Sequence, residues 1–193
     1  MEAIRSEYAR PIESSQGEPP GVGPDPFPPK RSADGRIEVR FDAYEVRMSH
    51  WILEPIVIRM RDGATVLSLE GSGWDGGGRA PSFPARDRVE LHLRQYPDGM
   101  TSYDLVVDVE TARCWFAGAE DEGCAAGGVE ALLESARERH VERTAPDLLA
   151  QGICPDCQAQ LYDSRLDKLL GRTQVKCLVC ERTWQLPPGA RLH

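Results

Sequence analysis

Apolar and polar residues alternate through most of the chain between residues 36 and 117. Ile56, Ile58 and Met60 occupy every second position up to Asp62–Gly63, which is a two-residue turn signal typical of a β-hairpin. Similar short runs, separated by turn residues, recur as far as Phe116. Because such alternation gives each strand one apolar face, it predicts an antiparallel meander of about five or six strands.

One irregularity interrupts the first of these runs. The apolar positions of residues 37–41 and those of residues 44–48 fall on opposite parities. A strand that keeps one apolar face through such a change needs an extra residue. The pattern therefore predicts a β-bulge near Asp42–Ala43.

The apolar spacing lengthens to three or four residues after Gly128, which predicts an amphipathic helix. Its apolar stripe is expected to cover one face of the sheet. The stripe comprises Val129, Leu132, Leu133, Ala136 and His140. Thr144 and Pro146 are expected to end this helix, and Asp147–Leu149 to form a separate short turn that stops at Gly152.

Differences in composition and in the spacing of apolar residues divide the chain into four parts. Residues 1–35 are rich in proline and glycine and offer too little apolar surface to offset the cost of ordering, so they are predicted to be a disordered tail. A proline-rich docking peptide is the alternative interpretation of this segment. An antiparallel β domain is predicted over residues 36–126, a covering and connecting helix over 127–151, and a small module over 152–193. The predicted fold class is α+β, with a mainly antiparallel β-sheet.

The charge of the chain limits the classes of function that it can have. It carries 23 basic and 31 acidic side chains, for a net charge of −8 and an isoelectric point near 5.1. This balance argues against a protein that coats nucleic acid or an anionic membrane. There is no run of about eighteen apolar residues and no secretory signal at the N-terminus, so we expect a cytoplasmic protein. In that compartment its six cysteines would stay reduced, which favours metal ligation over disulfides.

Four of those cysteines form the strongest motif. Cys154 and Cys157 make one C-x2-C pair, Cys177 and Cys180 make a second, and 19 residues separate the pairs. Each pair fits a tight turn that directs both sulfur atoms inward, so two pairs can surround one Zn²⁺ tetrahedrally. The spacing predicts a structural metal site.

The segment 152–187 resembles a zinc ribbon, in which two β-hairpins each offer one such knuckle to a single structural zinc ion. The motifs that carry the resemblance are Cys154–Cys157, with Pro155 after the first cysteine, and Cys177–Cys180. Gln158 and Glu181 follow the knuckles, where these folds often have glycine. This departure predicts strain or a slightly different turn at both positions.

The metal would stabilise a module that is too small to fold on burial alone. Zinc bound by four thiolates contributes on the order of 10 kcal/mol to such domains. Iron is the chemical alternative, because it also accepts four cysteine ligands. A catalytic zinc is not expected, since four protein thiolates leave no coordination position for water.

Zinc ribbons often contact nucleic acid, but the charge of this module gives little support to that function. Residues 151–193 carry six basic and four acidic side chains, and four thiolates with Zn²⁺ add two negative charges. Phosphate binding needs clustered positive charge. A local patch remains the alternative, and it would consist of Arg165, Lys168, Arg172 and Lys176.

The glycine-rich segment Gly71–Gly78 lacks the G-K-[ST] ending of a phosphate-binding loop and is interpreted as a connection between strands. Trp74 within it has two interpretations. It packs back on the sheet, or it is an exposed anchor for a partner.

The remaining candidates carry no catalytic signature. His50, His92 and His140 lack metal-ligand spacing, and no nucleophile–base motif is present. Cys114 lies in an apolar run and is predicted to be a buried small hydrophobe. Cys124 lies in an acidic connection, and a second metal site or a redox pair with Cys114 is the alternative.

These observations predict a non-enzymatic zinc-binding protein whose acidic β domain recognises a protein partner. One version is an immunity-type protein that neutralises a basic toxin enzyme, since the chain is small, acidic and without catalytic motifs. The alternative is a nucleic-acid-associated accessory factor that uses the ribbon. Neither prediction assigns a membrane role.

Overall fold

The computed structural model describes residues 27–46, 50–96, 101–162 and 174–188. Antiparallel strands dominate these residues, and one long helix accompanies them, so the α+β fold class is confirmed. No helix within the described ranges is long and apolar enough to cross a membrane.

The first sheet has four antiparallel strands in the order β1-β2-β3-β4. Its strands are β1 (Lys30–Arg31), β2 (Ile37–Val46), β3 (His50–Arg59) and β4 (Ala64–Ser68). The pairing of Lys30 with Val39 brings β1 into the sheet. The β region therefore extends into the last residues of the segment predicted as a tail, while residues 1–26 lie outside the described residues.

The second sheet has six strands in the order β10-β9-β8-β7-β5, and β6 also pairs with β7. Its strands are β5 (Trp74–Asp75), β6 (Ser82–Ala85), β7 (Arg88–Gln95), β8 (Ser102–Asp108), β9 (Arg113–Phe116) and β10 (Cys124–Ala125). A 3-10 turn at Glu120–Glu122 lies between β9 and β10, and a second at Ala126–Gly128 precedes the helix.

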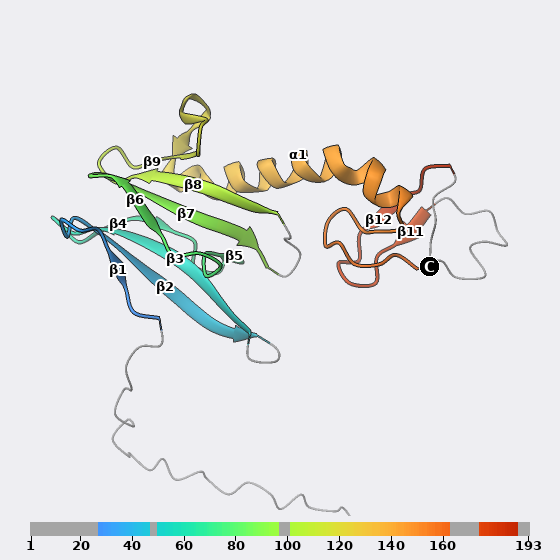
Figure 1. Ribbon diagram of the computed structural model, residues 1–193, viewed down its shortest axis with the longest axis horizontal. Coiled ribbons are helices and arrows are strands. Elements are labelled where there is room, and N and C mark those ends of the chain that lie inside the picture. The colour runs from blue at the N-terminus through green and yellow to red at the C-terminus, as the bar shows by residue number, and fades with distance from the viewer. Residues whose placement is uncertain (1–26, 47–49, 97–100, 163–173, 189–193) are drawn as a thin grey trace, which may run out of the picture.

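The two sheets stack face to face and share one apolar core (Figure 1). The first sheet contributes Ile37, Val39, Val57 and Leu67, and the second contributes Val89, Leu91, Leu93, Leu105 and Val107. The expectation of a single sheet covered by a helix is therefore wrong. Each sheet covers the apolar face of the other, because a sheet needs only one apolar partner layer.

Strand β2 is continuous, and the predicted bulge near Asp42–Ala43 is absent. Its register with β3 runs without a shift from Ile37 opposite Arg59 to Val46 opposite His50. The change of parity instead marks apolar residues on the second face of the strand, opposite to that of Ile37 and Val39, where Tyr44 pairs with the fully buried Ile52. The irregularity of this sheet lies between β3 and β4, at Val57/Ile58.

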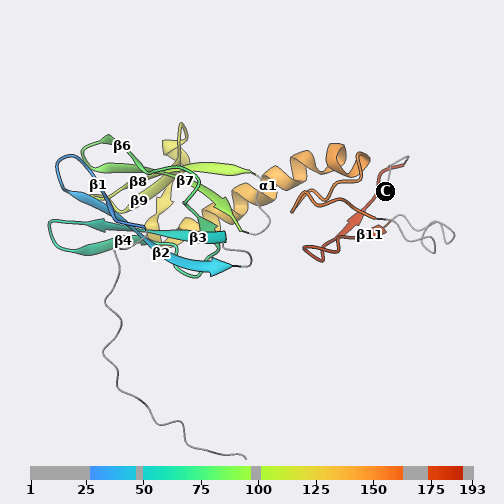
Figure 2. The same ribbon diagram turned by 60° about the horizontal axis from the view of Figure 1, so that its bottom comes forward.

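A single helix, α1 (Val129–Ala150), connects the sandwich to the C-terminal module, as Figure 1 and Figure 2 show. Only its first turns reach the sandwich core, through Val129 and Leu133. The predicted end at Thr144–Pro146 is wrong, because α1 continues through Pro146. A proline removes one helical hydrogen bond, and the carbonyl left without it belongs to Glu142, an exposed residue that water can solvate.

The C-terminal module has its own small core. Strands β11 (Gln174–Lys176) and β12 (Thr183–Gln185) pair as an antiparallel hairpin, and an isolated bridge joins Ile153 to Gln160. Leu149 from the last turn of α1 packs with Leu161 and Val175 of the module and with the cysteines. The helix end is therefore part of the module's core.

Candidate metal centre

The two C-x2-C segments form matching turns. The N–H of Cys154 donates to the carbonyl of Ala159 at 2.8 Å, and the N–H of Cys177 donates to the carbonyl of Arg182 at 2.8 Å. Each bond joins the first cysteine to the fifth residue after it. The chain therefore reverses in the same way at both knuckles, which turns both cysteine pairs toward a common centre.

The residues after the knuckles adopt the left-handed conformation that glycine favours. Gln158 has φ of 57° and Glu181 has φ of 62°. Side chains with a Cβ atom pay roughly 1–2 kcal/mol for this conformation. The predicted strain lies at these two positions, since the turn is kept although the residue is not glycine.

The four thiols lie together at metal-binding distances. Every Sγ atom of Cys154, Cys157, Cys177 and Cys180 lies within 4.8 Å of the other three. The separation is 3.6 Å between Cys154 and Cys180, and 3.5 Å between Cys157 and Cys177. A tetrahedron with metal–sulfur bonds of about 2.3 Å has an edge of about 3.8 Å. The residues present thus fit one metal ion, whereas a disulfide would need about 2.05 Å.

The surroundings of the thiols affect their ionisation unequally. Burial raises the pKa of Cys157 to about 11, and burial also raises the pKa of Cys180. Burial opposes ionisation of Cys177 too, but the N–H groups of Cys180 and Val179 outweigh it and lower the pKa of that thiol. Cys177 is therefore better prepared to meet a cation than Cys157 or Cys180. Metal binding would displace protons from those two thiols.

A buried carboxylate beside the cysteines joins three parts of the molecule. Asp156, inside the first knuckle, has a side chain only 1% exposed. It accepts a hydrogen bond from Arg137 of α1 and pairs with Arg182, which follows the second knuckle, at 3.0 Å. Sequence inspection missed this contact because a C-P-D-C motif does not reveal what its aspartate faces. Asp156 fixes the module against the helix.

The candidate nucleic-acid patch gains no support from the described residues. Arg165, Lys168 and Arg172 lie outside them, and Lys176 is exposed and pairs with Glu181 at 3.3 Å. One of the four cations is thus already paired with a carboxylate.

Trp74 is a core residue. It is 1% exposed and meets Tyr103 edge to face, with ring centroids 5.8 Å apart. The interpretation of Trp74 as an exposed partner anchor is therefore wrong. The sandwich core takes up the ring, since β5 carries it between the two sheets.

The glycine-rich connection around Trp74 is not a phosphate site. The N–H groups of Gly71 and Gly73 donate to the fully buried carboxylate of Glu54, and the N–H of Gly77 donates to buried Asp75. These are the donors that a phosphate would need. Two acidic side chains from the chain itself occupy them, which makes the segment a structural connection.

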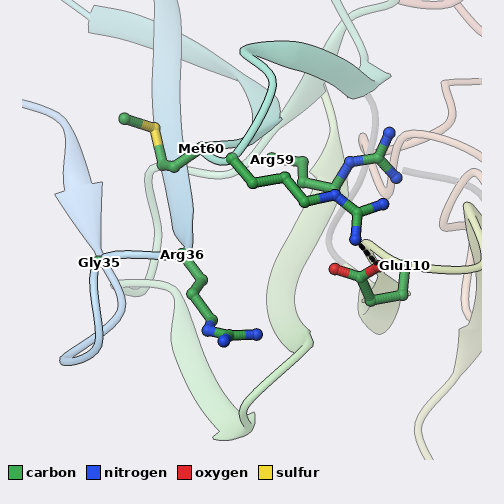
Figure 3. A pocket seen from close by; sticks show the side chains of 6 residues that line it. Gly35, Arg36, Arg59, Met60 and Glu110 are labelled. Atoms are coloured by element: carbon green, nitrogen blue, oxygen red, sulfur yellow. Dashed lines mark ion pairs between the residues drawn. The ribbon is translucent and has the colours of Figure 1, made fainter.

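An arginine-lined hollow of about 390 Å³ lies at one end of the sandwich, and Figure 3 shows its side chains. Arg61 pairs with Glu110, Arg59 pairs with Asp62, and Arg36 lies between two further carboxylates. Its positive charges are matched by neighbouring acids. The hollow is therefore better described as an ion-pair network than as an anion site.

The other candidate residues stay apart from the four cysteines. Cys114 and Cys124 lie opposite each other on β9 and β10, and burial raises the pKa of Cys114 to about 12. His92 contacts Asp104 at 2.7 Å, and His140 contacts Thr101 at 2.8 Å. Neither histidine approaches the thiol cluster, which consists of cysteines alone among the described residues.

Comparison with known proteins finds no family model, no curated protein and no solved structure that matches the chain.

Proposed function

We propose that this chain is a non-enzymatic zinc-binding protein whose acidic β domain recognises a protein partner. The observation that carries the metal assignment is the convergence of Cys154, Cys157, Cys177 and Cys180, whose sulfur atoms lie within 4.8 Å of one another. Four thiolates complete a tetrahedral set and leave no position for a water nucleophile. The metal's role is to hold the zinc ribbon together.

Zinc suits this role better than iron. The site joins two knuckles and the end of α1, and Asp156 ties the first knuckle to Arg137 and Arg182. A structural crosslink of this kind needs no change of oxidation state, and Zn²⁺ accepts four thiolates without redox chemistry. The two cysteine pairs have the ligand spacing typical of structural zinc.

Charge supports partner recognition by the β domain. Residues 36–126 carry 10 basic and 16 acidic side chains, a net charge of −6. The connection after β9 projects from the second sheet and exposes Glu120, Asp121 and Glu122 (Figure 1), of which Glu120 pairs with Arg88 at 3.0 Å. An acidic projection of this kind favours a partner with a basic surface, because complementary charge accelerates and orients association. An immunity-type role against a basic enzyme is one form of this function.

The partner assignment is tested by affinity isolation with the full-length chain. Neutralisation by Glu120→Gln, Asp121→Asn and Glu122→Gln should weaken capture of a basic partner. The matched control neutralises three exposed acids on α1, by Glu130→Gln, Glu138→Gln and Glu142→Gln, and should leave capture unchanged. Equal capture by both variants would contradict recognition through the acidic projection.

The metal assignment is tested separately by cobalt substitution. Co²⁺ held by four thiolates in a tetrahedral site has intense visible absorption, and we expect one equivalent to saturate the signal. Added Zn²⁺ should then abolish it, because zinc binds thiolate sites more tightly than cobalt. A spectrum typical of octahedral Co²⁺ would contradict a four-thiolate site.

A further inference from the structure

A second hollow, of about 210 Å³, lies between β2 and β3 of the first sheet and the β5–β6 connection of the second. Its lining is largely apolar and includes Phe27, Phe41, Leu53 and Pro81. Phe41 also packs against the sandwich core, so the hollow continues the core outward. An apolar cavity of about 150 Å³ accommodates benzene. The hollow is therefore large enough for one aromatic ring.

The wall of this hollow is held in place by buried hydrogen bonds. The N–H of Gly76 donates to the carbonyl of Leu53 at 2.8 Å. The carboxylate of Asp75, which is buried, accepts from the N–H groups of Leu53 and Gly77 at 3.1 and 2.9 Å. A Cβ atom at Gly77 would lie 2.9 Å from Leu53 Cδ1, so a larger residue there would displace the Leu53 side chain that lines the hollow. A wall fixed in this way spares a ligand the cost of ordering it.

Two cations flank the apolar lining. Lys30 and Arg79 both line the hollow and are exposed, and neither forms an ion pair with another described residue. By contrast, Arg31, Arg40 and Arg94 in the same sheets pair with carboxylates. In a chain with a net charge of −8, two cations beside one apolar hollow that have no carboxylate partner among the described residues indicate selectivity for an anion.

We propose that this hollow binds a small aromatic carboxylate with a single ring. The ring would lie against Phe41 and Leu53, and the carboxylate would face Lys30 and Arg79. The exposed Trp51, whose ring centroid lies 5.4 Å from that of Phe27, extends the aromatic rim. This binding site is independent of the metal centre and of the proposed protein partner.

The test is a titration of the full-length, isotope-labelled chain with 3-phenylpropanoate, followed by amide resonances in NMR spectra. The neutral control ligand is 3-phenylpropanamide, which has the same ring and linker. We expect both ligands to shift the amide resonances of Leu53, Gly76 and Gly77. The carboxylate should bind about fivefold more tightly, which corresponds to about 1 kcal/mol, because Lys30 and Arg79 attract the anion and not the amide.

Matched variants separate the cations from the ring site. Lys30→Gln with Arg79→Gln should reduce the affinity for 3-phenylpropanoate to that of the amide and leave the amide's affinity unchanged. Arg113→Gln removes an exposed arginine of β9 that lies outside the hollow, and should change neither affinity.

Two results would overturn the proposal. One is the absence of saturable shifts at Leu53, Gly76 and Gly77 up to millimolar ligand, which would remove the ring site. The other is equal affinity for the carboxylate and the amide, which would remove the role of Lys30 and Arg79. Both results would leave the metal centre and the partner assignment untouched.

Discussion

At the scale of single residues, the knuckles keep their shape against the preference of two side chains. Gln158 and Glu181 have positive φ angles of 57° and 62°, and both follow the second cysteine of a pair. The turn that directs two sulfur atoms inward requires this backbone, so the chain tolerates the conformational cost at both sites. Metal binding to four thiolates is large enough to outweigh that cost.

Glycine at these two positions should stabilise the module. We expect Gln158→Gly and Glu181→Gly each to raise the free energy of unfolding by about 0.5–1 kcal/mol, since removal of Cβ relieves the left-handed strain and outweighs the entropy cost of glycine. Urea unfolding of the metal-loaded chain measures the change. Gln185→Gly, in the extended strand β12, is the control and should be destabilising. If Gln158→Gly lost as much stability as the control, the left-handed backbone at Gln158 would not be strained.

Because the thiol of Cys114 is buried, we expect the folded chain to lose stability at alkaline pH. Burial raises the pKa of this thiol from 9.0 to about 12, so the unfolded chain releases the proton at lower pH than the folded chain does. The contribution of the protonated Cys114 thiol to the free energy of unfolding is therefore complete below pH 9. It declines between pH 9 and 12, by at most about 1.4 kcal/mol per pH unit. Unfolding of the reduced chain across this range measures the decline. In Cys114→Ala the slope should be shallower, and an unchanged slope would show that other groups cause it.

At the scale of elements, α1 is a connector whose two ends belong to different cores. Val129 and Leu133 join the sandwich, whereas Leu149 joins the core of the C-terminal module. Between them, Arg137 reaches the buried carboxylate of Asp156 in the first knuckle. The helix therefore positions the metal centre relative to the β domain through the Arg137–Asp156 ion pair and the apolar contacts of Ala145 and Leu149.

Removal of the Arg137 side chain should loosen this junction. Arg137→Met leaves Asp156 buried with Arg182 as its remaining partner, and we expect a loss of about 2 kcal/mol, because a buried charge that loses a partner is costly. Hydrogen exchange at the amides of Cys154, Asp156 and Cys157 in the first knuckle measures the loosening. Arg139→Met, on the exposed side of α1, is the control and should leave exchange unchanged. Equal protection in both variants would show that the ion pair does not hold the junction.

The strands and the helix could be predicted because their causes are local. Alternation at Ile56, Ile58 and Met60 predicts a strand, but the residue of this run that enters the shared core is Val57, so alternation alone does not reveal which face or which sheet a strand joins. The division into two sheets depends on contacts distant in sequence, such as those of Ile37 and Val39 with the second sheet. The change of parity at Tyr44 could equally mean a bulge or an outward apolar residue, and only the pairing with β3 decides between them.

At the scale of the whole molecule, the acidic β domain and the cysteine module are chemically distinct parts. The four cysteines could be found from spacing alone, because two short turns bring each pair together whatever the rest of the fold does. Trp74 could not be assigned in the same way. Its burial depends on β5 pairing with β7 and lying beside β3, and Glu54 and Asp75 hold the connection around it.

The metal content of the intact, reduced chain tests the central claim most directly. Native mass spectrometry should show one zinc ion per full-length chain. The ion should be absent from Cys154→Ser with Cys177→Ser and retained in Cys124→Ser, whose thiol lies outside the cluster. A chain that binds no metal, or that retains zinc equally after loss of Cys154 and Cys177, would contradict the account.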